Sequence, residues 1–403
     1  MSFDLEAFIA RYVIGRDESL FAADLAAHDD ELRAGIHGKS VLVIGGAGTI
    51  GSSYIKALLR YEPARLVVVD LNENGLTELT RDLRSTPDQF VPEQYTTYPV
   101  NFGDRIFERL FRAEGPFDIV AHFAAHKHVR SEKDRYSIEA MVENNLVNTV
   151  RLLDLLVESP PEHFFCVSTD KAANPANIMG ASKKLMEEAV MAYASVLPAT
   201  TARFANVAFS NGSLPAGFLE RIAKRQPLSA PSDVRRYFVS PIESGELCLL
   251  ACITGKAADI FFPRLGEPKM LTFSSIGDAL LRDMGYEPDH CATEEEARVK
   301  AEALTPESTT WPVAYFESDT SGEKSFEEFY TTGETVDLNR FEALGVVSGT
   351  AVHDIAGIRS VVDDLHALFE QPELPKSAIV DVLVRLVPTL HHVETGKSLD
   401  QKM

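Results

Sequence analysis

The amino-acid sequence predicts an α/β protein with a Rossmann-type, doubly wound parallel sheet and a smaller mixed α/β substrate-binding region. Short apolar strands alternate with amphipathic stretches in the first half of the chain, which is typical of a parallel sheet covered by helices on both faces. A glycine-rich turn follows the first strand, and an aspartate ends the second. Together these features predict a fold that binds a dinucleotide.

The expected elements follow in order along the chain. Residues 4–37 are expected to be helical because apolar side chains recur among charged ones, and Gly38 separates them from the first strand. Beyond Phe204, glycines and prolines divide the chain into shorter pieces, and two further helices are expected at Glu294–Glu302 and Ala378–Val387. The expected strands are Ser40–Ile44, Leu66–Val69, Thr96–Val100, Ile119–Phe123, Phe164–Ser168 and Thr201–Phe204.

This pattern divides the chain into four expected segments. Residues 1–38 form an N-terminal helical extension, and residues 39–205 form the dinucleotide-binding domain. Residues 206–335 are mainly the substrate-binding region, with segments that return to the first domain, and residues 336–403 form a C-terminal helical tail.

Composition excludes several classes of protein. A formal net charge of −21 argues against nucleic acid or an anionic membrane as a partner. The sequence has no apolar run long enough to span a bilayer and no signal-peptide pattern at its N-terminus, so a cytoplasmic protein is expected. Four scattered cysteines indicate neither a disulfide framework nor a metal site, and Cys248 and Cys252 are expected to be buried thiols on a helix.

The glycine-rich turn is the first candidate for cofactor binding. Glycine lets the backbone turn tightly and approach a pyrophosphate, which would lie at the N-terminus of the following helix. Asp70 ends the second strand about 25 residues after Gly45, the spacing of a carboxylate that binds the adenosine ribose. An acid there favours NAD over NADP, although Asp70 could instead be only a turn or capping residue. The candidate residues in the turn are Gly45, Gly48, Thr49, Ile50 and Gly51.

A second motif spans Ser168–Lys183. Met179 and Lys183 have the spacing of the Tyr-x-x-x-Lys pair of short-chain dehydrogenase/reductases, but methionine takes the tyrosine position. A thioether is a weak hydrogen-bond acceptor and cannot transfer a proton. Acid–base chemistry is therefore expected from Thr169, Asp170 and Lys171, which should follow a strand at the mouth of the cleft.

From about Ile14 to Tyr330 the chain resembles the extended short-chain dehydrogenase/reductases, and specifically the nucleotide-sugar 4,6-dehydratases of capsule and O-antigen synthesis. The most specific portion reads S-T-D-K-A-A-N-P-x-N-x-M-G-A-S-K, from Ser168 to Lys183. One branch of that family has tyrosine at the position of Met179 and another has methionine; this chain resembles the second, which includes UDP-N-acetylglucosamine dehydratases.

The resemblance implies further site residues. Asn101 stands where an aspartate usually recognises adenine, and Thr320 and Ser321 replace the first two residues of the motif R-P-G-E-K, which leaves the nucleobase, UDP or GDP, open. The further residues implied to bind the cofactor are Asn101, Phe102, Ala124, Ala125, Asn145 and Lys183. Those implied to bind the substrate are Lys127, His128, Asn206, Arg236 and Glu323.

The reaction implied by the resemblance uses a tightly bound NAD that is recycled in each turnover. Hydride leaves C-4 of the hexose, water is lost across C-5 and C-6, and hydride returns to C-6. Lys171 is assigned as the base at C-5 and Asp170 as the acid at the C-6 hydroxyl. The acceptor of the C-4 hydroxyl proton stays open between Thr169, Asp170 and an ordered water, as does the configuration at C-5.

Two other functions are considered. A nucleotide-sugar 4-epimerase would share the fold and the cofactor but would not need the Asp170–Lys171 pair. A catalytically inactive NAD-binding regulator would explain Met179, although the chain retains Asp170, Lys171, Lys183 and Arg236. The family resemblance also implies a homodimer or a larger homo-oligomer.

Overall fold

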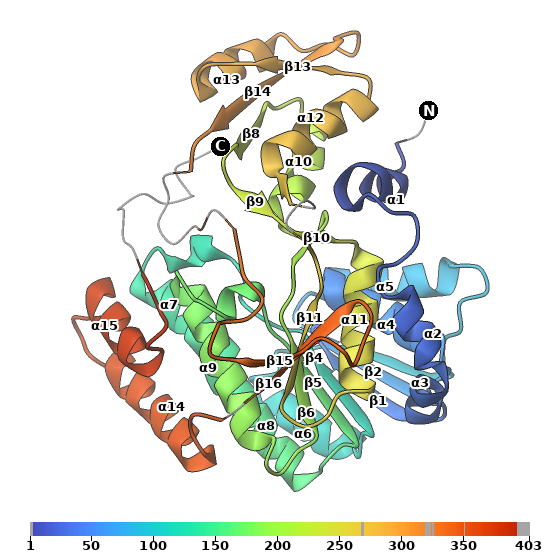
Figure 1. Cartoon of the computed structure of the whole chain (residues 1–403), viewed down its shortest axis with the longest axis vertical. Helices are drawn as coiled ribbons and strands as arrows, with labels where there is room; N and C mark the ends of the chain where they lie inside the picture. Colours follow the sequence, from blue (N-terminus) through green and yellow to red (C-terminus); the bar gives the residue numbers. More distant parts are fainter. Residues whose placement is uncertain (1–2, 267–269, 319–323, 325, 350, 393–403) are drawn as a thin grey trace.

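The protein has a large sheet with helices on both faces and a smaller region placed above it in Figure 1. The computed structural model describes residues 3–266, 270–318, 324, 326–349 and 351–392. The doubly wound α/β fold predicted from the sequence is confirmed. Within the described part, no helix has both the length and the apolar character needed to cross a membrane.

In the described residues the main sheet has nine strands, in the order β15-β16-β11-β6-β5-β4-β1-β2-β3. Every neighbouring pair is parallel except β11 with β16 and β15 with β16. From β1 the chain builds outward to β3 and then crosses back to β4 on the other side of β1, so ligands are expected outside the carboxyl ends of β1 and β4. The strands are β1 (Ser40–Ile44), β2 (Arg65–Asp70), β3 (Gln94–Pro99), β4 (Ile119–His122), β5 (His163–Val167), β6 (Ala199–Ala202), β11 (Asp259–Pro263), β15 (Thr335–Asp337) and β16 (Leu344–Ser348).

Helices cover the two faces of this sheet (Figure 1). One face carries α4 (Thr49–Leu59), α5 (Glu73–Ser85) and α11 (Pro241–Ile253), and α4 packs closely against α11. Cys248 and Cys252 are buried free thiols on α11, as expected. The other face carries α6 (Arg105–Glu114), α7 (Arg135–Val142), the π-helix η3 (Glu143–Val147), α8 (Asn148–Glu158) and α9 (Ile178–Tyr193).

The smaller region has its own hydrophobic core. Its three-stranded parallel sheet has the order β13-β14-β8, and two short pairs, β7 with β10 and β9 with β12, lie between it and the main sheet. Phe218, Leu228, Ile276 and Val313 are completely or almost completely buried in this core. The elements are β7 (Asn206–Val207), α10 (Leu214–Ala223), β8 (Leu228–Pro231), β9 (Arg235–Arg236), β10 (Phe238–Val239), β12 (Leu271–Thr272), α12 (Phe273–Asp283), β13 (Glu287–His290), α13 (Glu294–Glu302) and β14 (Thr310–Phe316).

The N-terminal extension, expected to be helical over residues 4–37, consists of several short helices. α1 (Leu5–Phe8) continues into the π-helix η1 (Ile9–Ile14), which ends because Gly15 takes a left-handed conformation with φ 66°. α2 (Ala22–Ala27) and α3 (Asp29–Ile36) follow. The side chains of Phe8, Ile9 and Val13 pack into the core of the smaller region, so the extension belongs structurally to both parts of the molecule.

The C-terminal segment is not purely helical, which corrects the expectation for residues 336–403. β16 is an apolar strand that pairs with β11, and β15 pairs with β16, so both strands extend the main sheet. Only then do α14 (Ile355–Phe369) and α15 (Lys376–Leu386) follow, and both pack against α9. Figure 1 shows them beside α9, on the face that also carries α7 and α8.

A buried ion-pair network joins the sheet to α9. Arg203, at the end of β6, is 0% exposed, and its guanidinium nitrogens lie 2.9 and 2.8 Å from the carboxylate oxygens of Glu187 and 2.9 and 2.7 Å from those of Glu334. Ser168 also donates a hydrogen bond to Glu187. Burial alone would raise the pKa of Glu187, but the charge and hydrogen bonds of Arg203 hold that pKa below its ordinary value.

Replacing Arg203 with Met should destabilise the protein strongly, because two largely buried carboxylates would lose their counter-charge. We expect the free energy of unfolding, measured with urea, to fall by about 3–5 kcal/mol. Arg298, half-exposed on α13, provides the control, and Arg298→Met should cost less than about 1 kcal/mol. Equal effects of the two substitutions would contradict a central role for Arg203.

Candidate active site

The glycine-rich turn brings the main chain close to the ends of β1 and β4. Gly45 has φ 81°, and a Cβ atom there would lie 2.4 Å from the backbone nitrogen of Ala124. A Cβ atom on Gly51 would lie 2.3 Å from the Gly45 carbonyl oxygen, whereas one on Gly48 would make only an ordinary 3.5 Å contact. Gly48 caps α4 without a side-chain hydrogen bond. The first amides of this helix are therefore suited to an anionic group.

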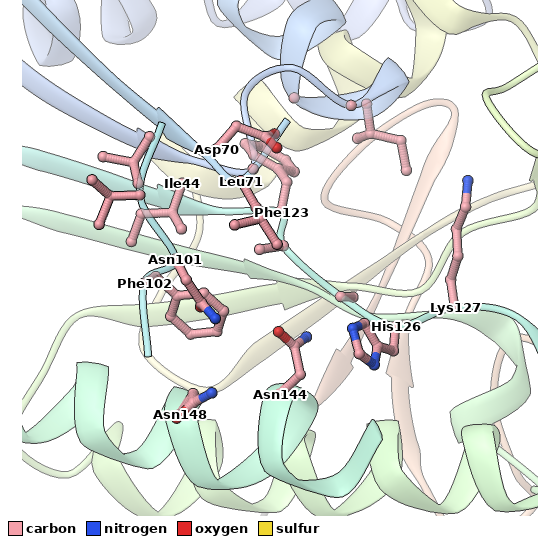
Figure 2. A pocket seen from close by; sticks show the side chains of 18 of the residues that line it. Ile44, Asp70, Leu71, Asn101, Phe102, Phe123, His126, Lys127, Asn144 and Asn148 are labelled. Atoms are coloured by element: carbon pink, nitrogen blue, oxygen red, sulfur yellow. The ribbon is translucent and has the colours of Figure 1, made fainter. Parts of the chain in front are cut away.

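A cavity of about 500 Å³ opens beside this turn (Figure 2). Asp70 and Leu71 lie on one side of it, and Asn144 and Asn148 project from the helix on the opposite side. Of the residues predicted to bind the cofactor, ten line the cavity: Gly45, Gly48, Thr49, Ile50, Gly51, Asp70, Asn101, Phe102, Ala124 and Ala125. Lys127, predicted to bind the substrate, lies at the end of the same cavity.

Asp70 is placed for both of the roles considered for it. One carboxylate oxygen accepts a hydrogen bond from the backbone nitrogen of Ala47 at 3.0 Å, and the other accepts one from Asn72 at 2.9 Å. The carboxylate thus holds the glycine-rich turn in place while it lines the cavity. It can orient the turn and also present an acceptor to a ribose hydroxyl.

Asn145 does not line the cavity, although it was predicted to bind the cofactor. Its side-chain amide accepts a hydrogen bond from the His126 nitrogen at 2.8 Å and donates to the His126 carbonyl at 2.9 Å and to Ser182 at 3.0 Å. It therefore fixes the loop after β4 from within η3, and π-helical turns of this kind are frequent at functional sites. Its neighbours Asn144 and Asn148 line the cavity, and the sequence motif did not single them out.

Thr169, Asp170 and Lys171 form one hydrogen-bonded cluster just beyond the carboxyl end of β5. The Lys171 ammonium and the Thr169 hydroxyl each lie 3.0 Å from the same carboxylate oxygen of Asp170. Asp170 is only 5% exposed. Because β5 pairs with β4, which ends at the cavity, the cluster lies one strand away from the predicted cofactor site.

Met179 and Lys183 lie on α9 and face the protein interior. Met179 is 3% exposed, and its backbone nitrogen donates to the Glu132 carboxylate at 2.9 Å. The Lys183 ammonium donates to the Val167 carbonyl at 2.7 Å and lies 3.0 Å from the sulfur of Met186. Burial lowers the pKa of Lys183. In this arrangement Lys183 ties α9 to the end of β5 and is not among the residues that line the cavity.

The predicted substrate-binding residues come from both regions. The Lys127 ammonium donates to the Asn211 carbonyl at 2.8 Å. The buried side-chain nitrogen of Asn206 has no hydrogen-bond partner within the described ranges, which marks it as available to a ligand. Arg236 is 5% exposed and donates to the Lys324 carbonyl at 2.9 Å. The ring of His128 lies beside Gly212, and Glu323 lies outside the described residues.

Glu327 is a buried carboxylate in this cluster that the sequence motifs did not identify. It is 5% exposed, and its oxygens lie 3.9 Å from the Lys171 ammonium, 3.8 Å from the Arg236 guanidinium and 4.0 Å from the Lys324 ammonium. Burial raises the pKa of Glu327 despite these three cations. Its sequence neighbour Glu328 is exposed, and no motif distinguishes the glutamate that faces the site from the one that faces solvent.

Comparison with known proteins establishes the family. Residues 41–347 match the model of the polysaccharide biosynthesis protein family. The chain belongs to this family. An uncharacterized membrane protein of Methanocaldococcus jannaschii is 29% identical over 352 residues, which cover 85% of this chain and 96% of that protein. The probable polysaccharide biosynthesis protein EpsC of Bacillus subtilis is 28% identical over 84% of this chain, which spans only 53% of EpsC.

Two kinds of named enzyme are also similar to this chain. The inverting UDP-N-acetylglucosamine 4,6-dehydratase of Campylobacter jejuni is 27% identical over 62% of this chain and 73% of that protein. A UDP-glucose 4-epimerase of Rickettsia typhi is 29% identical over 55% of this chain and 65% of that protein. The structure of a dTDP-glucose 4,6-dehydratase variant from Streptomyces venezuelae, with NAD bound, aligns with a TM-score of 0.54 at 20% identity, over 72% of this chain and 87% of that one. This structural likeness concerns the fold.

His122, at the end of β4, allows a test of whether its ring is buried in the neutral form. It is 1% exposed, and burial, with the charge of Lys183, lowers its pKa from 6.5 to about 3. Between these two pH values the unfolded chain binds a proton at this position and the folded chain does not. The free energy of unfolding should therefore fall as the pH is lowered through this range.

We expect lowering the pH from 7 to 5 to cost the wild type about 2 kcal/mol more than it costs His122→Asn, which lacks the titrating ring. Urea denaturation at the two pH values measures this difference. The exposed His37 provides the control, and His37→Asn should keep the pH dependence of the wild type. Identical pH dependence of the wild type and His122→Asn would rule out a buried neutral imidazole.

Proposed function

We propose that the protein is an NAD-dependent nucleotide-sugar 4,6-dehydratase that converts NDP-N-acetylglucosamine to the 4-keto-6-deoxy sugar. The contact of the Lys171 ammonium with the Asp170 carboxylate, 3.0 Å long and largely buried at the end of β5, carries this proposal. Elimination of water needs a base and an acid next to each other, and these two side chains provide them. The product would serve the synthesis of surface glycans, nonulosonic acids or amino sugars.

The cavity suits NAD as the cofactor. The glycine-rich turn leaves room for a pyrophosphate at the start of α4, and Asp70 is placed to accept a hydrogen bond from a ribose hydroxyl. A 2′-phosphate would be repelled by the Asp70 carboxylate, which supports NAD over NADP. When bound, NAD would accept the hydride from C-4 and return it to C-6.

The hydrogen bonds among Thr169, Asp170 and Lys171 support a role for each in the proposed elimination. Lys171 removes the C-5 proton, and Asp170 gives a proton to the departing C-6 hydroxyl. Their direct contact allows the proton that Lys171 gains to pass back to Asp170 after each turnover. Thr169 donates to Asp170 and can orient the C-4 hydroxyl. Met179 lies buried and has no transferable proton.

The diphosphate of the substrate would bind between the two regions. Arg236 can bind two phosphate oxygens in a fork geometry, and the buried nitrogen of Asn206 can donate to a third. Lys127 and His128 come from the loop after β4 and would face the sugar. The name of the Campylobacter jejuni relative supports UDP as the nucleotide, with GDP as the alternative.

Replacing Lys171 with Ala should reduce formation of the 4-keto product by on the order of 10²–10⁴-fold, because the base at C-5 is lost. The assay incubates the purified protein with NAD and UDP- or GDP-N-acetylglucosamine and follows the product by NMR. The exposed Lys256 serves as the control, and Lys256→Ala should keep full activity. A C-4 epimer with its C-6 hydroxyl intact would establish the epimerase instead, and unchanged sugar would favour a regulator.

Met179→Leu should leave the rate of product formation within a few-fold of the wild type, because leucine keeps the volume of the side chain and methionine takes no part in proton transfer. Thermal unfolding of the variant checks that the buried position is still filled. Loss of activity in a variant that stays folded would show a direct role for the thioether.

A further inference from the structure

Glu327 is a buried charged side chain beside the cluster of Thr169, Asp170 and Lys171, and the proposed reaction gives it no role. It lies in the segment that follows the smaller region, yet its carboxylate faces Lys171 beyond β5 and Arg236 on β9. The third cation, Lys324, comes from its own segment. Each of the three lies 3.8–4.0 Å away, beyond the distance of a good hydrogen bond.

Opposing influences act on the charge of Glu327 in this geometry. The negative form is favoured by Lys171, Arg236 and Lys324 and is disfavoured by burial and by the neighbouring Asp170. The balance depends on the cations being available to Glu327. The family resemblance implies that Arg236 binds the diphosphate of the substrate, and Lys324 lies beside the same carboxylate, so a bound diphosphate would compete for both cations.

We propose that Glu327 is a positioning residue that takes up a proton when the diphosphate of the substrate binds Arg236, and that it thereby favours the neutral form of Lys171. This inference rests on the proposed function, because it assumes that a nucleoside diphosphate binds at Arg236. It adds a link between substrate binding and the protonation of the base that the reaction requires.

The physical steps are simple. A bound diphosphate pairs with Arg236 and Lys324 and adds negative charge beside Glu327, so the carboxylate binds one proton from the solvent to become a carboxylic acid. Lys171 then faces one carboxylate, Asp170, in place of two, which favours transfer of its proton to Asp170 across their direct contact, so that the base is neutral and the acid is protonated. When the product leaves, Arg236 and Lys324 face Glu327 again and its proton returns to the solvent. The proton count therefore closes over one turnover.

Isothermal titration calorimetry with UDP tests the proton uptake directly. The NAD-loaded protein is titrated in buffers of different ionisation enthalpy near pH 8, where a terminal phosphate with a pKa of about 6 is already fully ionised. We expect the wild type to take up a measurable fraction of a proton, up to about one for each UDP bound. Glu327→Gln, which keeps the shape of the side chain, should bind UDP without this uptake.

Glu328 provides a matched control, because it is the adjacent glutamate, is exposed and accepts a hydrogen bond from Asn174. Glu328→Gln should show the proton uptake of the wild type. Binding of UDP to the wild type without proton uptake, or equal uptake in Glu327→Gln, would overturn the inference while leaving the dehydratase proposal intact. Proton uptake without any 4-keto product would overturn the dehydratase proposal alone, and no binding of UDP or GDP would overturn both.

Steady-state kinetics gives a second readout that a purely structural role would not change. In Glu327→Gln we expect kcat to lose the part of its pH dependence that comes from Glu327, while KM for the nucleotide sugar changes little. A variant that is only less stable would lose activity equally at every pH. An unchanged pH profile of kcat in Glu327→Gln would contradict the inference.

Discussion

The candidate site depends on the buried Arg203 guanidinium. It joins three segments, the end of β6, the middle of α9 and the chain just before β15, through the carboxylates of Glu187 and Glu334. Glu187 in turn holds Ser168, the residue before the acid–base cluster. A buried cation that lost these partners would be costly, so the network requires all three segments to be in place. The direction in which the chain leaves β5 is thereby fixed before any ligand binds.

The face of the sheet that carries α4 and α11 depends mainly on close packing of these two helices. A Cβ atom on Gly245 of α11 would lie 2.3 Å from the backbone of Ser53, so only glycine lets α11 approach α4 at this point. The N-terminal extension holds the start of α11, because the Arg16 guanidinium lies 2.6 and 2.7 Å from the two oxygens of Glu243. The extension therefore holds α11, which packs against α4, and the first turn of α4 faces the cavity.

The sequence predicted the first six strands to within two residues, because each is an apolar run between turn residues. It predicted the glycine-rich turn from the glycine spacing between a strand and a helix, and it predicted the cluster of Thr169, Asp170 and Lys171 from the residue types after a strand and the family resemblance. It missed β15 and β16, because β16 joins the sheet by pairing antiparallel with the distant β11 and β15 is a three-residue edge strand that pairs with β16. It also gave no sign of Glu327 or of the inward direction of Lys183, because both depend on how distant segments pack around a side chain.

In the proposed function, methionine at position 179 leaves the proton transfers to residues at the interface of the two regions. Beside a tyrosine, a lysine at position 183 would lower the pKa of the hydroxyl, but a thioether has no proton to release. Lys183 instead binds the carbonyl at the end of β5. The remaining proton donors and acceptors, Thr169, Asp170 and Lys171, follow β5. The charges around them come from Arg236 in the smaller region and from Lys324 and Glu327 in the segment that follows it. Asp170 and Lys171 thus have these charges around them only when the smaller region lies against the sheet, which is the junction where the proposed function places the diphosphate of the substrate.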